Sequence, residues 1–430
     1  MNRLPIKIVV VTTLFLMAVV ISPVSGAEKV EPCFDRLPVG WTVTRSFVMS
    51  GDETAAIGKR LGVPIKKVSN TFLLVHGRQV QVNILEAKSD DGVVRLHSVI
   101  SRMKGSPAFC VQKKRQVIEF TGSNVTVALA TKISYELGFV CKPSEARYRI
   151  TADIATIDEA DYMSFNKLFN LFIKTNINSI NKQTSSQIAE LSKRFQFGNQ
   201  ITLRASGQKT QKPVYNFSPV PLKERTSIKS GTVTYSFSET HNLLGMPYVT
   251  LTADITTREA GLTPTAREAD KILLAATTFW PVDDPKIISL AKKITAGKVN
   301  REAKVEAILK WLTPGRNIKF GGPVTGSRWG VKKVLKQKYG HCWDFSDCFV
   351  TLCRASDIPC RQVGGWLYGM SGHIWAEVLF EGKGWQQVDP TGGGKLKCGI
   401  YHIPYFVTED GNMPILYVSM PKIKIIDTKR

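Results

Sequence analysis

Three residues near the C-terminal end of this sequence could together carry out acyl transfer. Cys342 offers a thiol, His373 an imidazole and Asp389 a carboxylate, in that order along the chain. A thiol attacks a carbonyl carbon as the thiolate, so it needs a base such as imidazole to take its proton. The imidazole in turn needs a third group that fixes its tautomer and orientation. The sequence therefore predicts a cysteine acyl-transfer site with Cys342 as nucleophile.

The segment that begins at Cys342 has the pattern of an amphipathic helix, with apolar residues three or four positions apart. These residues are Phe345, Cys348, Phe349 and Leu352. The spacing predicts a helix that starts at Cys342 and carries the thiol on its buried side. The positive end of the helix dipole would stabilise a thiolate, and a backbone N–H group there could donate to an oxyanion. Asp344 and Asp347 are expected to interact favourably with the same dipole.

The segments that carry His373 and Asp389 are predicted to form an antiparallel hairpin. A two-residue turn would place Asp389 opposite Ala376, whose side chain faces away from His373. A three-residue loop would instead place Asp389 opposite Trp375, on the face that His373 shares. Catalysis requires the three-residue loop, and the glycines around the turn permit it.

The stretch from about 281 to 395 resembles the transglutaminase-like superfamily, whose fold is related to papain. The motifs that carry this resemblance are Gly340–Trp343, Arg354–Arg361, Gly372–Glu377 and Gly384–Thr391. The resemblance implies that Cys342 is the nucleophile, that His373 acts as general base and then as acid, and that Asp389 orients it. It also implies a papain-like C-terminal domain. We expect the site to use no cofactor and no metal.

The sequence departs from the animal transglutaminases at the oxyanion donor. Those enzymes carry a tryptophan just before a Thr-Gly-Ser motif, whereas Val324 precedes this motif here. Trp329 is a candidate replacement, and simple packing is the alternative for that indole. The calcium sites and paired C-terminal barrels of those enzymes have no counterpart in the 41 residues after Asp389. The resemblance therefore does not establish a protein-crosslinking activity.

A run of cations lies immediately upstream of the nucleophile and contains no acidic residue. Its members are Arg328, Lys332, Lys333, Lys336 and Lys338. They could form an ordinary solvated helix face, or they could border the cleft and attract acidic peptides. The candidate substrate-binding residues are Lys332, Lys333, Trp343 and Trp375.

Composition and charge limit the classes of partner. The chain has 430 residues, of which 43% are hydrophobic and 22% charged, as in ordinary globular proteins. Its formal net charge of +23 favours an anionic partner, such as an envelope or cell-wall surface. No zinc-finger, helix-turn-helix or RNA-binding signature accompanies this charge, so no specific nucleic acid is expected. The expected partner of the site is a protein or peptide substrate.

The N-terminus has the pattern of a signal peptide. Arg3 and Lys7 precede an apolar run over residues 8–21, and small residues occupy Ser25 to Ala27. A membrane anchor is the alternative, but 14 residues fall short of the roughly 20 that span a bilayer. We expect cleavage near Ala27 and export to the periplasm, the cell envelope or the exterior.

The eight cysteines are interpreted against this exported setting, where disulfides are permitted. If Cys342 is a free thiol, seven remain, and an odd number cannot all pair within one chain. We expect a disulfide between Cys110 and Cys141. The other cysteines near the nucleophile lack the doublets of structural zinc sites, so they are expected to be buried thiols. These are Cys348, Cys353, Cys360 and Cys398.

Periodicity predicts an α+β protein of several domains. After the signal peptide, 1–27, we expect a small α+β domain over 28–143 and a mixed β-rich domain with helices over 144–262. A transglutaminase-like domain would occupy 263–430, with its core at 281–395. In the first domain a strand–strand–helix pattern occurs twice. Its elements are strands 71–76 and 79–86 with helix 91–104, and strands 108–111 and 117–121 with helix 124–137.

Together these patterns predict a secreted cysteine enzyme that acts on amide bonds through a thioester. Water as the acceptor would make it a peptidase or deamidase, and an amine acceptor would make it a crosslinking enzyme. The sequence leaves this choice open. The competing prediction is a non-catalytic scaffold that binds the envelope and carries a vestigial transglutaminase-like domain.

Overall fold

The structure is a computed structural model. It describes residues 34–35, 37–38, 40–75, 77–104, 109–157, 190, 193–195, 197–204, 214–227, 232–243, 245–258, 271–322, 328–368, 372–380, 383–392, 398–413, 415–419 and 421–429. The predicted signal peptide and the segment Val324–Ser327 lie outside the described residues. The chain mixes helices and sheets, so the α+β prediction is confirmed.

The N-terminal unit is an antiparallel sheet with helices. Its strands, in the spatial order β1-β2-β3-β5-β4, are Trp41–Val48, Ile65–Val75, Arg78–Ala87, Gln116–Thr121 and Cys110–Lys113. Its helices are α1 (Gly51–Leu61), α2 (Asp90–Met103) and α3 (Val127–Glu136). Both predicted strand–strand–helix patterns are present, and β1 and α1 are additional. Helix α1 begins with a capping box, in which the Ser50 N–H donates to Glu53 Oε2 at 2.9 Å.

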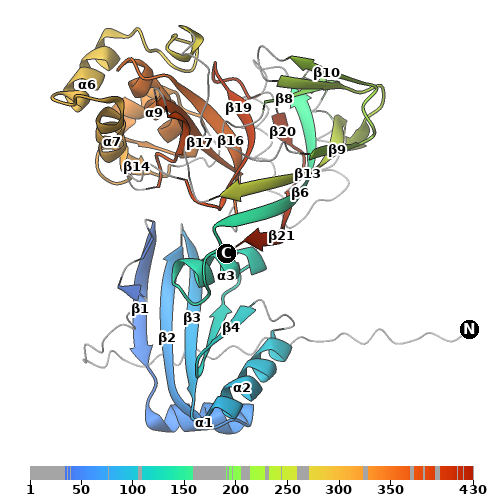
Figure 1. The fold of residues 1–430 in the computed structure, drawn as a ribbon, viewed down its shortest axis with the longest axis vertical. Helices are drawn as coiled ribbons and strands as arrows, with labels where there is room; N and C mark the ends of the chain where they lie inside the picture. Colours follow the sequence, from blue (N-terminus) through green and yellow to red (C-terminus); the bar gives the residue numbers. More distant parts are fainter. Residues whose placement is uncertain are drawn as a thin grey trace, which may run out of the picture.

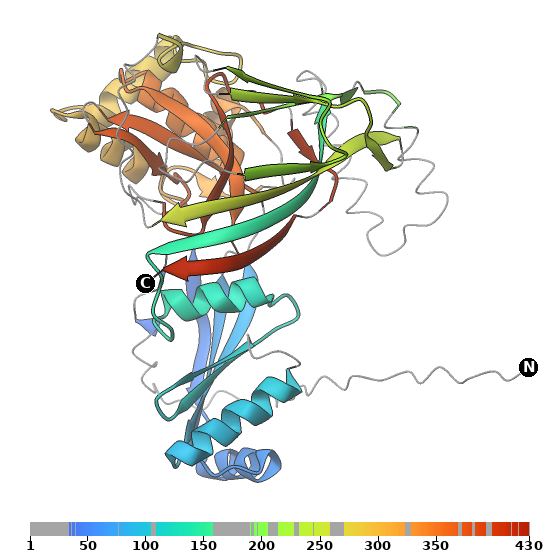
Figure 2. The same ribbon diagram turned by 45° about the vertical axis from the view of Figure 1, so that its right-hand side comes forward.

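Helix α3 connects the N-terminal unit to the rest of the molecule. Leu129 and Ile133 lie in the core of the N-terminal sheet. Ala128 and Tyr135 pack against a second core that belongs to residues beyond 145. Figures 1 and 2 both show α3 between the N-terminal sheet and the long strand β6 (Glu145–Ile157). One helix therefore packs against two cores.

The central sheet is built around β6 and β13 (Met246–Arg258), which pair antiparallel over ten residues with Ile154 opposite Val249. The other strands that join it are β7 (Phe197–Gly198), β9 (Val214–Ser218), β12 (His241–Leu243), β20 (Ile415–Tyr417) and β21 (Lys422–Lys429). A separate three-stranded sheet contains β8 (Gln200–Arg204), β10 (Lys223–Ser227) and β11 (Thr232–Ser236).

The C-terminal strands amend the predicted division of the chain. Strands β20 and β21 both pair with β6 rather than with the sheet that precedes them in sequence. The chain after residue 262 therefore contributes strands to the central sheet as well as to the unit that follows it. The physical reason is that β13 covers only one edge of β6, and the returning chain supplies hydrogen-bond partners along the opposite edge.

The third unit has a four-stranded antiparallel sheet in the order β18-β17-β16-β19. Its strands are β16 (Cys360–Leu367), β17 (Gly372–Phe380), β18 (Gly384–Val388) and β19 (His402–Thr408). Its helical elements are η3 (Lys271–Leu273), α6 (Pro285–Thr295), α7 (Arg301–Leu312), α8 (Val331–Gln337) and α9 (Cys342–Arg354). The short strands β14 (Lys319–Phe320) and β15 (Tyr339–Gly340) pair in parallel just before α9.

Helix α9 lies at the centre of this third unit. It contacts β16 and β17 as well as α6, α7 and α8, and Figure 1 shows these helices gathered on one side of the sheet. The helix is buried along its whole length after Cys342, which is only half-buried. The predicted helix start at Cys342 is confirmed. The sheet also shares a core with the central sheet, in which Trp366 and Tyr401 pack near Tyr148.

The cysteines differ from one sequence prediction. Cys141 is an exposed free thiol, so the predicted disulfide with Cys110 is wrong. Cys110 is instead buried at the start of β4, with its sulfur 3.1 Å from Ser101 Oγ on α2. The four cysteines predicted as buried thiols are buried and free. None of the described helices has the length and apolar character needed to cross a bilayer.

Candidate active site

The start of α9 is held by the carboxylate of Asp344. Its Oδ2 accepts a hydrogen bond from the His341 N–H at 2.9 Å, and its Oδ1 accepts one from the Trp329 N–H at 2.7 Å. Gly340 makes this arrangement possible, because a Cβ there would lie 2.6 Å from Asp344 Cβ. Asp344 is fully buried, and this burial raises its pKa to about 6 despite the two backbone hydrogen bonds. Asp344 therefore caps the helix that presents Cys342.

The hairpin of β17 and β18 has the register that catalysis requires. Phe380 pairs with Gly384, which leaves three residues in the loop, and Ala376 pairs with Val388. The next position places Asp389 beside Trp375, on the face that carries His373. His373 Nε2 and Asp389 Oδ2 are 2.8 Å apart. The predicted three-residue loop is confirmed.

His373 is influenced by both the Asp389 carboxylate and the Cys342 thiol. Burial alone would lower the pKa of His373. The negative charge of Asp389 and the hydrogen bonds to Asp389 and Cys342 outweigh this effect and raise the pKa to about 10. The imidazole is therefore cationic at neutral pH, the charge state that would accompany a thiolate.

Asp389 is fixed at both carboxylate oxygens. Oδ1 accepts hydrogen bonds from the Thr391 N–H at 2.9 Å and from Thr391 Oγ1 at 2.7 Å. Burial raises the pKa of the carboxyl, but the His373 charge and the hydrogen bonds from His373 and His402 together hold it well below its usual value. Asp389 is thus an anion at neutral pH and keeps one orientation.

His402 is a member of this constellation that the sequence patterns did not identify. Its Nε2 lies 2.9 Å from Asp389 Oδ2, the same oxygen that faces His373. His402 opens β19, which pairs with β16 on the side opposite β17. A single histidine at a strand start carries no recognisable motif, so only the folded sheet brings it to Asp389.

A comparison with protein families decides the class of this unit. Residues 288–390 match the family model of the transglutaminase-like superfamily. They form a transglutaminase-like core. The resemblance predicted from the motifs is confirmed for this part of the chain.

Individual relatives are more distant. An uncharacterized protein, YebA of Bacillus subtilis strain 168, is 27% identical over 131 residues, which cover 25% of this chain and 18% of that protein. A candidate cysteine protease from Cytophaga hutchinsonii aligns in structure with 16% identity over 66% of this chain and 92% of that one, with a TM-score of 0.42. The periplasmic domain of TgpA from Pseudomonas aeruginosa aligns with 18% identity over 46% and 69%, with a TM-score of 0.29.

The two tryptophans predicted to bind substrate are both buried in the transglutaminase-like core. Trp375 is fully buried, with its ring stacked on His373 at a centroid distance of 6.0 Å and its Nε1–H bonded to Gln387 Oε1 at 3.0 Å. We correct the prediction for Trp375, because a side chain without exposed surface supports the imidazole instead of touching substrate. Trp343 is 8% exposed and packs with Ile374 beside Cys342.

Trp329, the predicted oxyanion donor, is held close to the start of α9 through its backbone bond to Asp344. Its ring is partly buried against the core, and Lys333 Nζ lies 4.3 Å from the ring centroid. The indole N–H is buried and has no hydrogen-bond partner among the described residues. This indole N–H would be free to donate to an oxyanion, and the packed ring would equally serve the core alone. The oxyanion role of Trp329 therefore stays a prediction.

The predicted basic run is not one surface. Arg328 is buried and paired with Asp347, to which its Nε donates at 2.6 Å. Asp347 also accepts hydrogen bonds from Trp280 Nε1 and Gln362 Nε2, both at 2.9 Å. Arg328 is therefore a structural cation, and Asp347 anchors α9 in the core rather than facing solvent near the dipole.

The lysines of the basic run remain on the surface. Lys332 and Lys333 on α8 are exposed, as are Lys336 and the following Lys338. Lys332 pairs with Asp284 at 2.7 Å. The exposed positive face therefore lacks Arg328, and one of its lysines, Lys332, is paired with an acidic residue.

His373, Asp389 and His402 are also a possible set of metal ligands among the described residues. Their ligand atoms all lie within 4.8 Å of one another, and two imidazoles with one carboxylate suit several transition metals. Both Nε2 atoms face Asp389 Oδ2 at hydrogen-bond distance. Hydrogen bonds from the two imidazoles to this carboxylate oxygen account for the same geometry.

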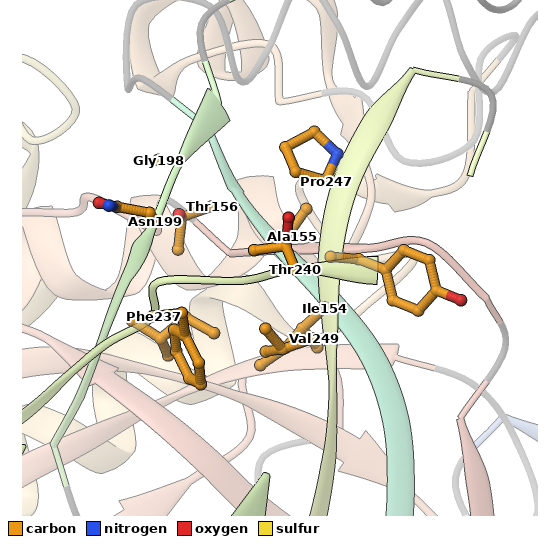
Figure 3. A pocket seen from close by; sticks show the side chains of 11 residues that line it. Ile154, Ala155, Thr156, Gly198, Asn199, Phe237, Thr240, Pro247 and Val249 are labelled. Carbon is orange, nitrogen blue, oxygen red and sulfur yellow. The ribbon is translucent and has the colours of Figure 1, made fainter. Parts of the chain in front are cut away.

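A small hollow lies in the central sheet, and none of His373, Asp389 and His402 lines it (Figure 3). Its lining includes Ile154, Thr156, Phe237 and Val249. The space amounts to about 10 Å³, which accommodates at most one water molecule. Thr156 Oγ1 is buried there without a hydrogen-bond partner among the described residues. This hollow is too small for a substrate.

Proposed function

We propose that this protein is an exported cysteine enzyme that cleaves or transfers amide bonds through a thioester on Cys342. The observation that carries the proposal is the 2.8 Å contact between His373 Nε2 and Asp389 Oδ2. Cys342, at the start of α9, is near enough to the His373 ring to favour its charged form. Each of the three groups comes from a different place in the transglutaminase-like core.

The chemistry follows from these contacts. The Cys342 thiolate attacks the amide carbonyl carbon, and the C–N bond then breaks as His373 gives its proton to the leaving amine. The product is a thioester and a free amine. An acceptor that His373 deprotonates attacks the thioester and releases Cys342. Water as acceptor gives hydrolysis, and a primary amine gives a new amide.

The position of Cys342 supports its role as nucleophile. It stands at the first turn of α9, where the helix dipole stabilises negative charge. The cationic His373 adds a second stabilising charge. The thiol is half-buried, whereas Cys348, Cys353 and Cys360 are fully buried and inaccessible to a peptide.

The proposed substrate is a protein or peptide in an exported compartment. Export rests on the N-terminal signal pattern alone. The net charge of +23 supports contact with an anionic envelope surface. Mass determination of the secreted protein should place the mature N-terminus next to Ala27.

The deciding experiment is thiol labelling of the purified mature protein with iodoacetamide near neutral pH, followed by peptide mass mapping. We expect Cys342 to react faster than Cys141, although Cys141 is the more exposed thiol. A Cys342→Ala variant should retain the fold and lose thioester formation and turnover, and Cys342→Ser should be nearly as inactive. Cys141→Ala is the matched control and should retain full activity.

Three product assays separate the possible reactions. Ammonia release indicates deamidation, a new N-terminus indicates peptide hydrolysis, and incorporation of a labelled primary amine indicates crosslinking. If Cys342 reacts no faster than Cys141, or if Cys342→Ala retains turnover, the protein is a scaffold with a vestigial transglutaminase-like core.

A further inference from the structure

We propose that His402 is a positioning residue that holds Asp389 through its Nε2–H, and that the buried Lys132 of the N-terminal unit, beside Tyr401, opposes protonation of the His402 imidazole. The inference rests on the proposed cysteine chemistry. It adds a fourth side chain to the site and assigns a role to the region that precedes the transglutaminase-like core.

The contacts of Asp389 define the task of His402. Oδ1 is bound by Thr391, and Oδ2 faces both His373 at 2.8 Å and His402 at 2.9 Å. A carboxylate that bonds only to the moving base would shift whenever His373 changes its protonation state. The hydrogen bond from His402 keeps Oδ2 in place through the reaction cycle.

The other ring nitrogen fixes the tautomer of His402. His402 Nδ1 is buried and has no hydrogen-bond partner among the described residues. A proton there would be an N–H without an acceptor, which is unfavourable in a buried place. The single ring proton therefore belongs on Nε2, where it donates to Asp389. His402 acts as a neutral donor, so Asp389 keeps its negative charge for His373.

Lys132 supplies the second part of the inference. It projects from α3 and is only 5% exposed, with Nζ 5.3 Å from the centroid of the Tyr401 ring, the residue next to His402. Buried lysines are rare and need a reason. Burial lowers the pKa of Lys132 to about 8, although the charges of Glu136 and Asp389 favour its cationic form.

The charges that face His402 come from three elements. Asp389 follows β18, His373 lies on β17, and Lys132 lies on α3. Burial lowers the pKa of His402 most, Asp389 raises it, and the cations His373 and Lys132 lower it again. The negative and positive neighbours together leave a neutral imidazole that is bonded to an anion.

The first test measures the pH dependence of Cys342 alkylation, with Cys141→Ser as the parent protein. We compare His402→Phe, which keeps the ring size but removes the donor, with His402→Gln, which restores an N–H donor. The Phe variant should move the acid midpoint of the alkylation rate upward by roughly one pH unit, because Asp389 loses a hydrogen bond to its charged form. The Gln variant should return the midpoint toward that of the parent.

A double-mutant cycle tests whether His402 acts through Asp389. In an Asp389→Asn background, replacing His402 with Phe should have no further effect on the rate or the midpoint. Additive effects, or equal midpoints in the Phe and Gln variants, would overturn the positioning role. Circular dichroism and thermal unfolding identify variants that have not folded, and the Gln variant keeps the test decisive if the Phe variant is among them.

The second test observes His402 directly. The chain has six histidines, so ¹⁵N-histidine NMR is practical, and the signal that His402→Gln removes is that of His402. We expect the Nε2–H tautomer at neutral pH. Lys132→Met should raise the pKa of His402, because a nearby cation is lost. Lys142→Met is the matched control, since Lys142 Nζ also lies over the Tyr401 ring, at 5.1 Å, and its loss should leave the His402 titration unchanged.

An unchanged titration of His402 in Lys132→Met, or an Nδ1–H tautomer, would overturn the part of the inference that concerns the N-terminal unit. These outcomes differ from a failure of the proposed function. If the proposed function is wrong, Cys342 shows no preferential alkylation even in the parent protein, whatever residue occupies position 402.

Discussion

The N-terminal unit and the transglutaminase-like core are both antiparallel sheets with helices, but they bury different side chains. Among the described residues of the N-terminal unit, the buried polar groups are hydroxyls and amides, with Lys132 as the one buried charged group. The core fully buries several charged groups, including Asp344, Asp347 and Glu377. Burying a charge is costly unless it is paired, so such groups are retained where they have a task.

The charged groups of the core form pairs and networks. Arg361 bonds to Glu377 at 2.8 Å and to Glu409 at 3.3 Å, and Arg354 donates to backbone carbonyl groups, including that of Cys360. These contacts hold the strands and helices that carry the triad. The one buried charge of the N-terminal unit, Lys132, lies on the face that meets the core. Among the described residues, the buried charges of these two regions thus lie in the core and on the face of α3 that meets it.

We expect the largest effect on activity, where substitutions in the core and in the N-terminal unit should differ most. His373→Ala should lower kcat/KM by about 10² to 10⁴-fold, because the proton-transfer group is lost. Asp389→Ala should have a smaller effect, since the imidazole remains but is less well oriented. His97→Ala on α2 is the matched control in the N-terminal unit and should be neutral. Kinetics on one amide substrate measure all three, and equal effects of His373→Ala and His97→Ala would place the chemistry elsewhere.

The second expected effect is on stability, where loss of a buried ion pair in the core is compared with loss of an exposed pair in the N-terminal unit. Arg328→Met leaves Asp347 as an unpaired charge in the core, so the free energy of unfolding should fall by about 3 to 5 kcal/mol. The N-terminal control is Arg115→Met, which breaks an exposed pair with Asp90 and should leave stability unchanged within measurement error. Urea denaturation at neutral pH gives both values. A small loss for Arg328→Met would mean that the buried pair is replaceable by apolar packing.

The pH dependence should sharpen the comparison further. The pKa of His373 is raised to about 10, so its contribution to stability is complete below about pH 6.5 and is lost as the pH rises toward 10. The pKa of Asp389 in the folded protein is depressed. Its contribution to stability is therefore present when the pH is above the ordinary pKa of an aspartate, and it is lost as the pH falls through the pKa of the folded state. The stability difference between wild type and His373→Gln, measured by denaturation from pH 5 to 10, should shrink at the alkaline end.

The smallest expected effect concerns the lysines of α8. If this face draws in acidic peptides, Lys333→Gln with Lys336→Gln should lower kcat/KM for an acidic peptide several-fold and reduce its salt dependence, since charges are screened over about 10 Å at 0.1 M. A neutral peptide should be unaffected. Lys59→Gln with Arg60→Gln on α1 is the matched control. Equal salt dependence for both peptides would leave the α8 lysines as an ordinary solvated face.

The sequence determined local features well where one physical rule dominates. The three- and four-residue spacing after Cys342 predicted α9, and the parity argument at the hairpin predicted that His373 and Asp389 share a face. The order of the motifs identified the transglutaminase-like core. Helix α1 was missed although Ser50 and Glu53 have the spacing of a capping box. That signal was present in the sequence and could have been used.

Only the tertiary structure decided which distant residues meet. His402 reaches Asp389 because β19 pairs with β16 across the sheet, and Lys132 reaches Tyr401, the neighbour of His402, because α3 packs against two cores. The same reason explains why Arg328 proved to be buried and why β21 returned to β6. Spacing rules act along one element and fix which face a side chain occupies. They carry no information about which other element covers that face, and this choice decided the environment of each charge in the site.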